Sequence, residues 1–164
     1  ADGILRGLTA THDSGLLHRD IKPSNIFLAQ TPEGSEVVKL IDFGIAVDRS
    51  EAIDFEGEGN VIGTLPYMAK EQLRALPMGP PADLFAVGVV LWKMLTGVLP
   101  MPELPAIAAV GRRLHSGTPP IRESHGDVPV KLAQVIDQAL ALEADDRFPD
   151  AEAMRVALRA AMQG

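Results

Sequence analysis

The sequence predicts a mainly α-helical protein with one small β-hairpin. Apolar residues recur at helical spacing at the start of the chain and through most of its second half. Between these stretches, two short apolar runs flank Thr31-Pro32-Glu33-Gly34, whose residue types favour a turn between paired strands. With 164 residues, 46% of them hydrophobic, the chain has the size and apolar content of one folded domain or of part of a larger one.

The first half of the chain is expected to hold one helix, a loop and the hairpin. The helical spacing at the start ends at Gly15, a residue type that commonly ends helices. Residues 16–25 show no period, and Pro23 lacks the amide hydrogen that a helix interior or a central strand needs, so these residues form a loop. The two strands of the hairpin are expected at 26–28 and 37–41.

The second half is expected to be helical. A nearly continuous apolar stretch from Leu84 to about Leu95 predicts a helix that is buried on most sides, with Asp83 as its N-cap and Gly97 at its end. Three further helices are expected at 107–114, 132–140 and 151–162, the last of them capped by Asp150.

Composition and charge exclude several classes of protein. With 15 Lys and Arg against 22 Asp and Glu, the formal net charge is −7, so the chain lacks the basic surface typical of nucleic-acid binders. The longest apolar run is too short to cross a bilayer, and no membrane segment is expected in this chain. The absence of cysteine excludes disulfides and thiolate chemistry and favours a cytoplasmic location. The four histidines form no metal-ligating cluster and are expected mostly at the surface.

Two loops carry the residues with catalytic potential. The first is His18-Arg19-Asp20-Ile21-Lys22-Pro23-Ser24-Asn25, and the second begins with Asp42-Phe43-Gly44 directly after the expected hairpin. In order and spacing they resemble the H-R-D-x-K-x-x-N and D-F-G motifs of the protein kinase family. The segment from Gly63 to Glu71 is similar to the family's stretch that ends in A-P-E, with Lys70 in place of the proline, and Asp146-Arg147-Phe148 resembles the arginine motif before the last helix.

The resemblance spans nearly the whole chain and implies how it is organised. Residues 1–164 correspond to the carboxy-terminal lobe of a kinase catalytic domain, that is, the α+β kinase fold without its amino-terminal lobe. Within it, residues 18–25 would be the catalytic loop and residues 42–71 the activation segment. Since the family uses its amino-terminal lobe to cover ATP, these residues alone are expected to be a fragment that binds ATP weakly.

The resemblance also implies the site residues. Asp20 would accept the proton of the attacking substrate hydroxyl, or orient it, and Lys22 would place an ammonium against the transferring phosphate of ATP. Thr64 would bridge these two residues and help to select the hydroxyl-bearing acceptor. Asn25 and Asp42 carry the oxygen ligands that Mg²⁺ prefers, and with Lys22 they would bind Mg-ATP.

Other motif residues are expected to have structural roles. His18 and Phe43 would pack and hold the two loops, and Arg147 would form a buried ion pair with Glu71. Asp83 is expected to hold the backbone of the catalytic loop, as its counterpart in the family does.

The sequence therefore favours a bacterial-type serine/threonine protein kinase that transfers the γ-phosphoryl group of ATP, with Mg²⁺, to protein substrates. The full-length protein could be anchored in a membrane, as often in such kinases. One alternative is a catalytically impaired kinase lobe that acts as a protein-binding or regulatory module. Another is a small-molecule phosphotransferase, which Lys22, the Asp42-Phe43-Gly44 motif and the peptide-binding segment from Gly63 to Glu71 disfavour.

Overall fold

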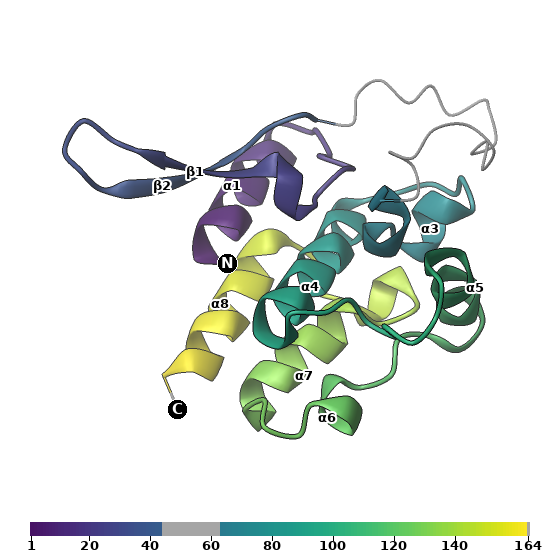
Figure 1. Ribbon diagram of the computed structural model, residues 1–164. Helices are drawn as coiled ribbons and strands as arrows, with labels where there is room; N and C mark the ends of the chain where they lie inside the picture. Colours follow the sequence, from purple (N-terminus) through teal and green to yellow (C-terminus); the bar gives the residue numbers. More distant parts are fainter. Residues whose placement is uncertain (44–62, 164) are drawn as a thin grey trace.

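The computed structural model describes residues 1–43 and 63–163, which are mostly helical with a single two-stranded hairpin (Figure 1). This confirms the predicted fold class. The helices are α1 (Asp2–Asp13), α3 (Lys70–Leu73), α4 (Pro80–Thr96), α5 (Ala106–Ser116), α6 (Ile121–Ser124), α7 (Val130–Ala139) and α8 (Ala151–Met162), and the strands are β1 (Ile26–Gln30) and β2 (Glu36–Leu40). Single 3₁₀ turns lie at Pro23–Asn25, Leu65–Tyr67 and Ala144–Asp146.

Helix α4 is the centre of the core, with α7 and α8 beside it (Figure 1). Every residue from Ala82 to Trp92 is buried, because this stretch is apolar on almost all sides. At Gly88 an added Cβ would lie 3.0 Å from the Cβ of Ala139, so the glycine lets α7 approach closely. None of the helices in the described ranges is long and apolar enough to cross a membrane.

The start of α4 differs from the prediction. The helix begins at Pro80, so Asp83 lies in its first turn and is not its N-cap, which is Gly79. Proline fits the first turn because its missing amide hydrogen would have no partner there in any case. The side chain of Asp83 is thereby left to bind elsewhere. The predicted C-terminal end is confirmed, since Gly97 follows the helix with a left-handed φ of 77°.

The hairpin is antiparallel, with Ile26 opposite Leu40 and Gln30 opposite Glu36, and it lies against α1 (Figure 1). The strands are shifted slightly from the predicted ranges, because polar residues continue the pairing up to the turn. At Gly3 in α1 an added Cβ would lie only 2.6 Å from Cγ2 of Val38, so the contact between helix and strand depends on this glycine.

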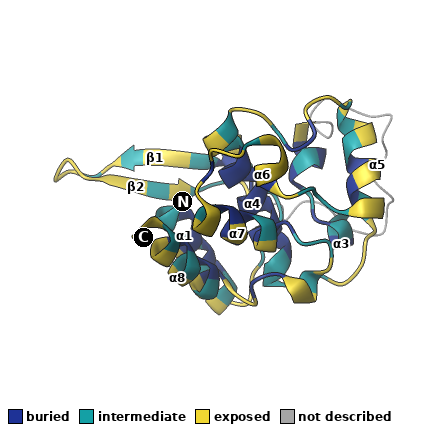
Figure 2. Ribbon diagram, turned by 90° about the horizontal axis from the view of Figure 1, so that it is seen from below, coloured by how far each residue is buried: buried dark blue, intermediate teal, exposed yellow. Residues whose placement is uncertain are grey.

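The remaining predicted helices are present, with two differences in their buried faces (Figure 2). Asp150 caps α8 as predicted, its Oδ1 accepting a hydrogen bond of 2.7 Å from the amide of Ala153. Met162, in the last turn of α8, is 74% exposed because this turn extends past the core. In α5 Ile107 is exposed as well, and the buried face contains Arg113.

Candidate active site

The predicted catalytic loop, residues 18–25, is held at its start by Asp83 of α4. Asp83 Oδ2 accepts a hydrogen bond of 2.9 Å from the amide of His18, and Oδ1 accepts one of 2.7 Å from the amide of Arg19. Arg19 has a φ of 69°, a left-handed conformation that costs energy for a residue with a side chain. The two hydrogen bonds to a buried carboxylate stabilise it. The predicted role of Asp83 is therefore confirmed.

His18 joins the catalytic loop to the loop that begins at Asp42. The ring is fully buried, lies 3.1 Å by Nε2 from the carbonyl oxygen of Ile41, and stacks on Phe43 with ring centroids 4.6 Å apart. The amide of Asp20 donates to Nδ1 at 3.4 Å, so the neutral Nε2–H tautomer fits both contacts. Burial lowers the pKa of His18. The predicted packing role of His18 and Phe43 is thus confirmed.

Three of the predicted catalytic side chains meet at one point. Lys22 Nζ lies 3.0 Å from Asp20 Oδ2 and donates a hydrogen bond of 2.8 Å to Thr64 Oγ1. Asn25 Nδ2 donates to the backbone carbonyl of Asp20 at 2.8 Å and to Oδ2 at 2.9 Å. Asp20 Oδ1 has no hydrogen-bond partner within the part of the chain that the structure describes. One carboxylate oxygen is therefore held by Lys22 and Asn25, and the other is left to accept a hydrogen bond.

The predicted metal ligands, Asn25 and Asp42, come from neighbouring backbone. The amide of Ile41 donates a hydrogen bond of 3.0 Å to the carbonyl of Asn25, so Asp42 follows directly after the residue that pairs with Asn25. Asn25 is buried, and among residues 1–43 and 63–163 its Oδ1 accepts only a long bond of 3.3 Å from Ser24. Asp42 is exposed and has a left-handed φ of 54°. A carboxylate and an amide oxygen of this kind fit a divalent cation that also keeps phosphate and water oxygens as ligands.

The segment 63–71 is fixed at its end by a buried ion pair. The guanidinium of Arg147 holds both carboxylate oxygens of Glu71, at 2.7 and 3.1 Å, and donates further hydrogen bonds to the carbonyls of Ala141, Leu142 and Pro81. Such a bidentate pair with every donor satisfied tolerates burial. The prediction of this pair is confirmed. Residues 44–62, the middle of the predicted activation segment, lie outside the described residues.

Three residues of the site were missed in the sequence. His12, expected at the surface, is 7% exposed in its side chain and lies 2.9 Å by Nε2 from Asp83 Oδ2. Gln72 bonds Arg19 O through Nε2 at 2.8 Å and accepts from the amide of Ala69 through Oε1 at 3.1 Å. Arg113 reaches the segment 63–71 from α5. For His12 and Arg113 the sequence offers one indication of burial, because each lies at the spacing of the apolar face of its helix. For Gln72 it offers none.

The chain is similar to known protein kinases. The family described as protein kinase domain matches residues 1–156. The serine/threonine-protein kinase Pkn1 of Myxococcus xanthus is 36% identical over 97% of this chain and 23% of its own length. MasK of the same species, named a tyrosine-protein kinase, is 39% identical over 87% of this chain and 21% of its own length. The chain thus spans about a quarter or less of these two relatives.

The kinase domain of PknI from Mycobacterium tuberculosis is a solved structure with the same fold. The TM-score is 0.68 at 24% sequence identity, and the match covers 98% of this chain and 52% of that chain. At this identity the likeness concerns the fold alone.

Proposed function

The chain belongs to the protein kinase family, and from that premise we propose that the protein transfers the γ-phosphoryl group of ATP to serine or threonine hydroxyls of proteins. The observation that carries this proposal is the contact of Lys22 Nζ with both Asp20 Oδ2 and Thr64 Oγ1. It joins the carboxylate of the catalytic loop to the first residues of the segment that would receive the substrate.

Asp20 would handle the proton of the acceptor. Its Oδ2 is engaged by Lys22 and Asn25, which fixes the plane of the carboxylate, while Oδ1 has no partner among the described residues. A substrate hydroxyl that donates to Oδ1 is oriented for attack and can pass its proton to this oxygen as the bond to phosphorus forms. Positioning of this kind is the main contribution a protein makes to phosphoryl transfer.

Lys22 would stabilise charge on the transferring group. Its ammonium has three donors, and two of them are used by Asp20 and Thr64. The third can donate to a phosphate oxygen, where the interaction strengthens as negative charge develops. Thr64 holds Lys22 in this position from the substrate side, so the lysine is oriented before the substrate arrives.

Asn25 and Asp42 would hold Mg²⁺. When bound, the ion supplies positive charge to the phosphate oxygens of ATP. For the protein itself, two features serve this purpose: the amide nitrogen of Asn25 is turned to Asp20, which leaves its oxygen for the metal, and the exposed carboxylate of Asp42 follows one residue after the backbone bond to Asn25.

Serine and threonine are the proposed acceptors, although one relative is named a tyrosine-protein kinase. The family resemblance supports this choice, since a lysine two residues after the catalytic aspartate is the serine/threonine pattern, and here that lysine is bonded to Thr64. Phosphoamino-acid analysis of a generic protein substrate labelled by the full-length protein tests it. We expect labelled phosphoserine and phosphothreonine, whereas label only in phosphotyrosine would contradict the proposed acceptor.

The same assay separates the other functions. An aminoglycoside offered in parallel with the protein substrate is expected to remain unlabelled, and labelling of the aminoglycoside alone would favour a small-molecule phosphotransferase. If neither acceptor is labelled while the folded protein retains a binding partner, the chain is a binding module.

A Thr64→Ser variant keeps the hydroxyl that holds Lys22 and should retain activity, whereas Thr64→Val should lose most of it.

A further inference from the structure

Arg113, in the middle of α5, is a buried cation that the reaction described above does not use. The residue is 6% exposed, and no carboxylate of the described residues pairs with it. Burial, and the nearby charge of Arg147, lower the pKa of Arg113 to about 10, which still leaves the guanidinium charged near neutral pH. A buried charge without a carboxylate is costly unless hydrogen bonds satisfy its donors. The hydrogen-bond acceptors around Arg113 therefore show how its buried charge is accommodated.

Within the described ranges, all of its hydrogen bonds go to one short stretch of backbone. Arg113 Nη1 donates to the carbonyl of Pro66 at 2.7 Å, and Nη2 donates to the carbonyls of Met68 at 2.5 Å and Leu65 at 3.3 Å. This stretch begins directly after Thr64, whose hydroxyl receives the hydrogen bond of Lys22. A single side chain of α5 thus fixes the backbone next to the proposed catalytic contact.

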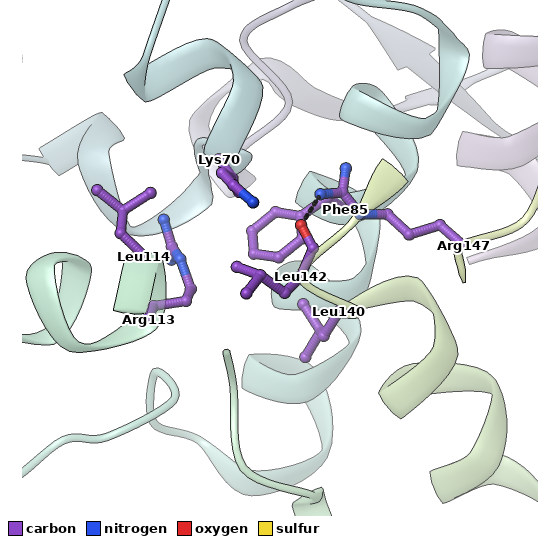
Figure 3. A pocket seen from close by; sticks show the side chains of 7 residues that line it. All are labelled: Lys70, Phe85, Arg113, Leu114, Leu140, Leu142 and Arg147. Carbon is purple, nitrogen blue, oxygen red and sulfur yellow. Dashed lines mark hydrogen bonds between the residues drawn. The ribbon is translucent and has the colours of Figure 1, made fainter. Parts of the chain in front are cut away.

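Phe85 of α4 connects this contact to the buried ion pair at the other end of the segment. The guanidinium carbon of Arg113 lies 4.9 Å from the centre of the Phe85 ring and that of Arg147 lies 5.0 Å from it, both within cation–π range (Figure 3). The small pocket around these side chains leaves no room for a water molecule, so it is packing and not a ligand site. Arg147 holds Glu71 at one end of the segment, and Arg113 holds its start.

On its other side Arg113 lines an open groove of about 330 Å³, together with Pro66 and Val110. Shortening the side chain to alanine would therefore leave a space that solutes can reach from this groove. A small guanidinium compound could occupy the position of the lost group and restore its hydrogen bonds.

From these contacts we infer that Arg113 is a positioning residue, which holds residues 65–68 so that Thr64 and the protein acceptor are aligned with Asp20. The inference rests on the proposed kinase function. It predicts an effect on the protein substrate and little effect on ATP, because none of the ATP- and metal-binding residues proposed above is among the hydrogen-bond partners of Arg113 in the described ranges.

The test compares Arg113 with its neighbour Arg112 in the full-length protein. Arg112 is 58% exposed in its side chain and makes only a loose pair of 3.8 Å with Glu103, so Arg112→Ala is a matched control. For Arg113→Ala we expect kcat/KM for a protein or peptide substrate to fall at least about tenfold. The KM for Mg-ATP should change less than about twofold, and Arg112→Ala should behave like the unchanged protein. The inference would be overturned if the KM for Mg-ATP rose as much as kcat/KM for the peptide fell, or if Arg113→Ala lost no peptide activity.

Chemical rescue separates positioning from a general loss of structure. Methylguanidine at millimolar concentration should restore part of the peptide activity of Arg113→Ala and should do nothing for Asp20→Asn. Arg113→Lys, which keeps the charge but not the planar fork, should be impaired as well. No rescue together with a wild-type profile for Arg113→Lys would overturn the inference.

Hydrogen exchange of the same variants tests Arg113 without relying on activity. If the unchanged protein transfers no phosphate, the proposed function fails, and the effect on substrate binding fails with it. Faster amide exchange in residues 65–71 of Arg113→Ala, but not of Arg112→Ala, would still support the fixing of this backbone. Unchanged exchange would overturn it, whatever the activity.

Discussion

Two residues of the proposed catalytic centre, Arg19 and Asp42, have left-handed backbone conformations that side chains disfavour, with φ of 69° and 54°. For Arg19 the stabilising contact is Asp83, which accepts hydrogen bonds from the amides of both His18 and Arg19. Asp83 itself is buried at the start of α4, with His12 beside it. The strained backbone of Arg19 is thus stabilised by the carboxylate of Asp83, which lies in the buried helix α4. Strain of this kind is typical of sites where function fixes the backbone.

A first prediction concerns His18 and pH. Because burial lowers its pKa, the unfolded state takes up a proton near the usual histidine pKa of about 6.5, whereas the folded state takes up its proton only at lower pH. The stabilising effect of the neutral ring is present above that pKa and is lost as pH falls below it. The free energy of unfolding, measured by urea titration, should therefore decrease between about pH 7.5 and about pH 5.5.

The control for this prediction removes the titrating ring. Glutamine has an amide that can still donate to the carbonyl of Ile41, so His18→Gln should flatten the pH dependence in this range. His115 is exposed, and His115→Gln should leave the slope unchanged. An equal slope in His18→Gln and in the unchanged protein would show that another group is responsible.

At the level of helices and strands, buried charge and close packing join segments that are far apart in the sequence. Arg147 crosses from the last turn before α8 to Glu71 in α3, and it also reaches the carbonyl of Pro81 in α4. Arg155 and Arg159 of α8 bind Asp2 of α1 at the surface. The buried pair and the exposed pairs have similar distances between nitrogen and oxygen, but their contributions to stability should differ.

The second prediction tests that difference. Arg147→Met leaves the buried carboxylate of Glu71 without its partner and should lower the free energy of unfolding by about 3–5 kcal/mol. Arg155→Met removes two surface ion pairs, with Glu152 and Asp2, each of which should contribute less than about 1 kcal/mol. Similar losses for the two variants in urea denaturation would contradict a special role of the buried pair.

The third prediction tests how the hairpin lies against α1. In Gly3→Ala the new Cβ would meet Val38 at 2.6–2.8 Å, too close without movement of the strand, and stability should fall by about 1–3 kcal/mol. Gly111 lies in α5 with no atom within 4 Å of an added Cβ, so Gly111→Ala should raise stability by about 1 kcal/mol. If Gly3→Ala is also stabilising, the helix and the hairpin are not in close contact.

At the scale of the whole molecule, the hairpin of β1 and β2 projects from the helical part of the structure (Figure 1), and several of its apolar side chains are exposed. Phe27 is 57% exposed and Leu28 is 65% exposed, although both belong to the strand that follows the catalytic loop. In the protein kinase family an amino-terminal lobe helps to cover ATP, so we expect the nucleotide site to be incomplete without that lobe.

The fourth prediction follows from this surface. Residues 1–164 prepared alone should bind Mg-ATP at least about tenfold more weakly than a kinase domain that has both lobes, as measured by calorimetry. Asp42→Asn, which removes a proposed metal ligand, should weaken the binding further. Micromolar affinity of residues 1–164 for Mg-ATP would contradict the prediction.

The sequence predicted what depends on local pattern and motif. Helices α4, α5, α7 and α8 followed from their apolar periodicity, whereas the short helix α6 was not predicted, and the pairing of Arg147 with Glu71 followed from the family resemblance. It could not predict contacts between single polar side chains across the fold. Arg113 and His12 are such cases, because a polar or charged side chain is ordinarily exposed, and only the fold brings Arg113 to backbone carbonyls and His12 to Asp83.

The most direct measurement is phosphate transfer from Mg-ATP to a protein substrate by the full-length protein, by its Asp20→Asn variant and by Asp145→Asn as a matched control. Asp145 is an exposed carboxylate outside the site. We expect transfer by the unchanged protein and by Asp145→Asn, and a loss of at least about a hundredfold in Asp20→Asn, since its carboxylate would orient the acceptor and take its proton. Undiminished transfer in Asp20→Asn would contradict the proposed site.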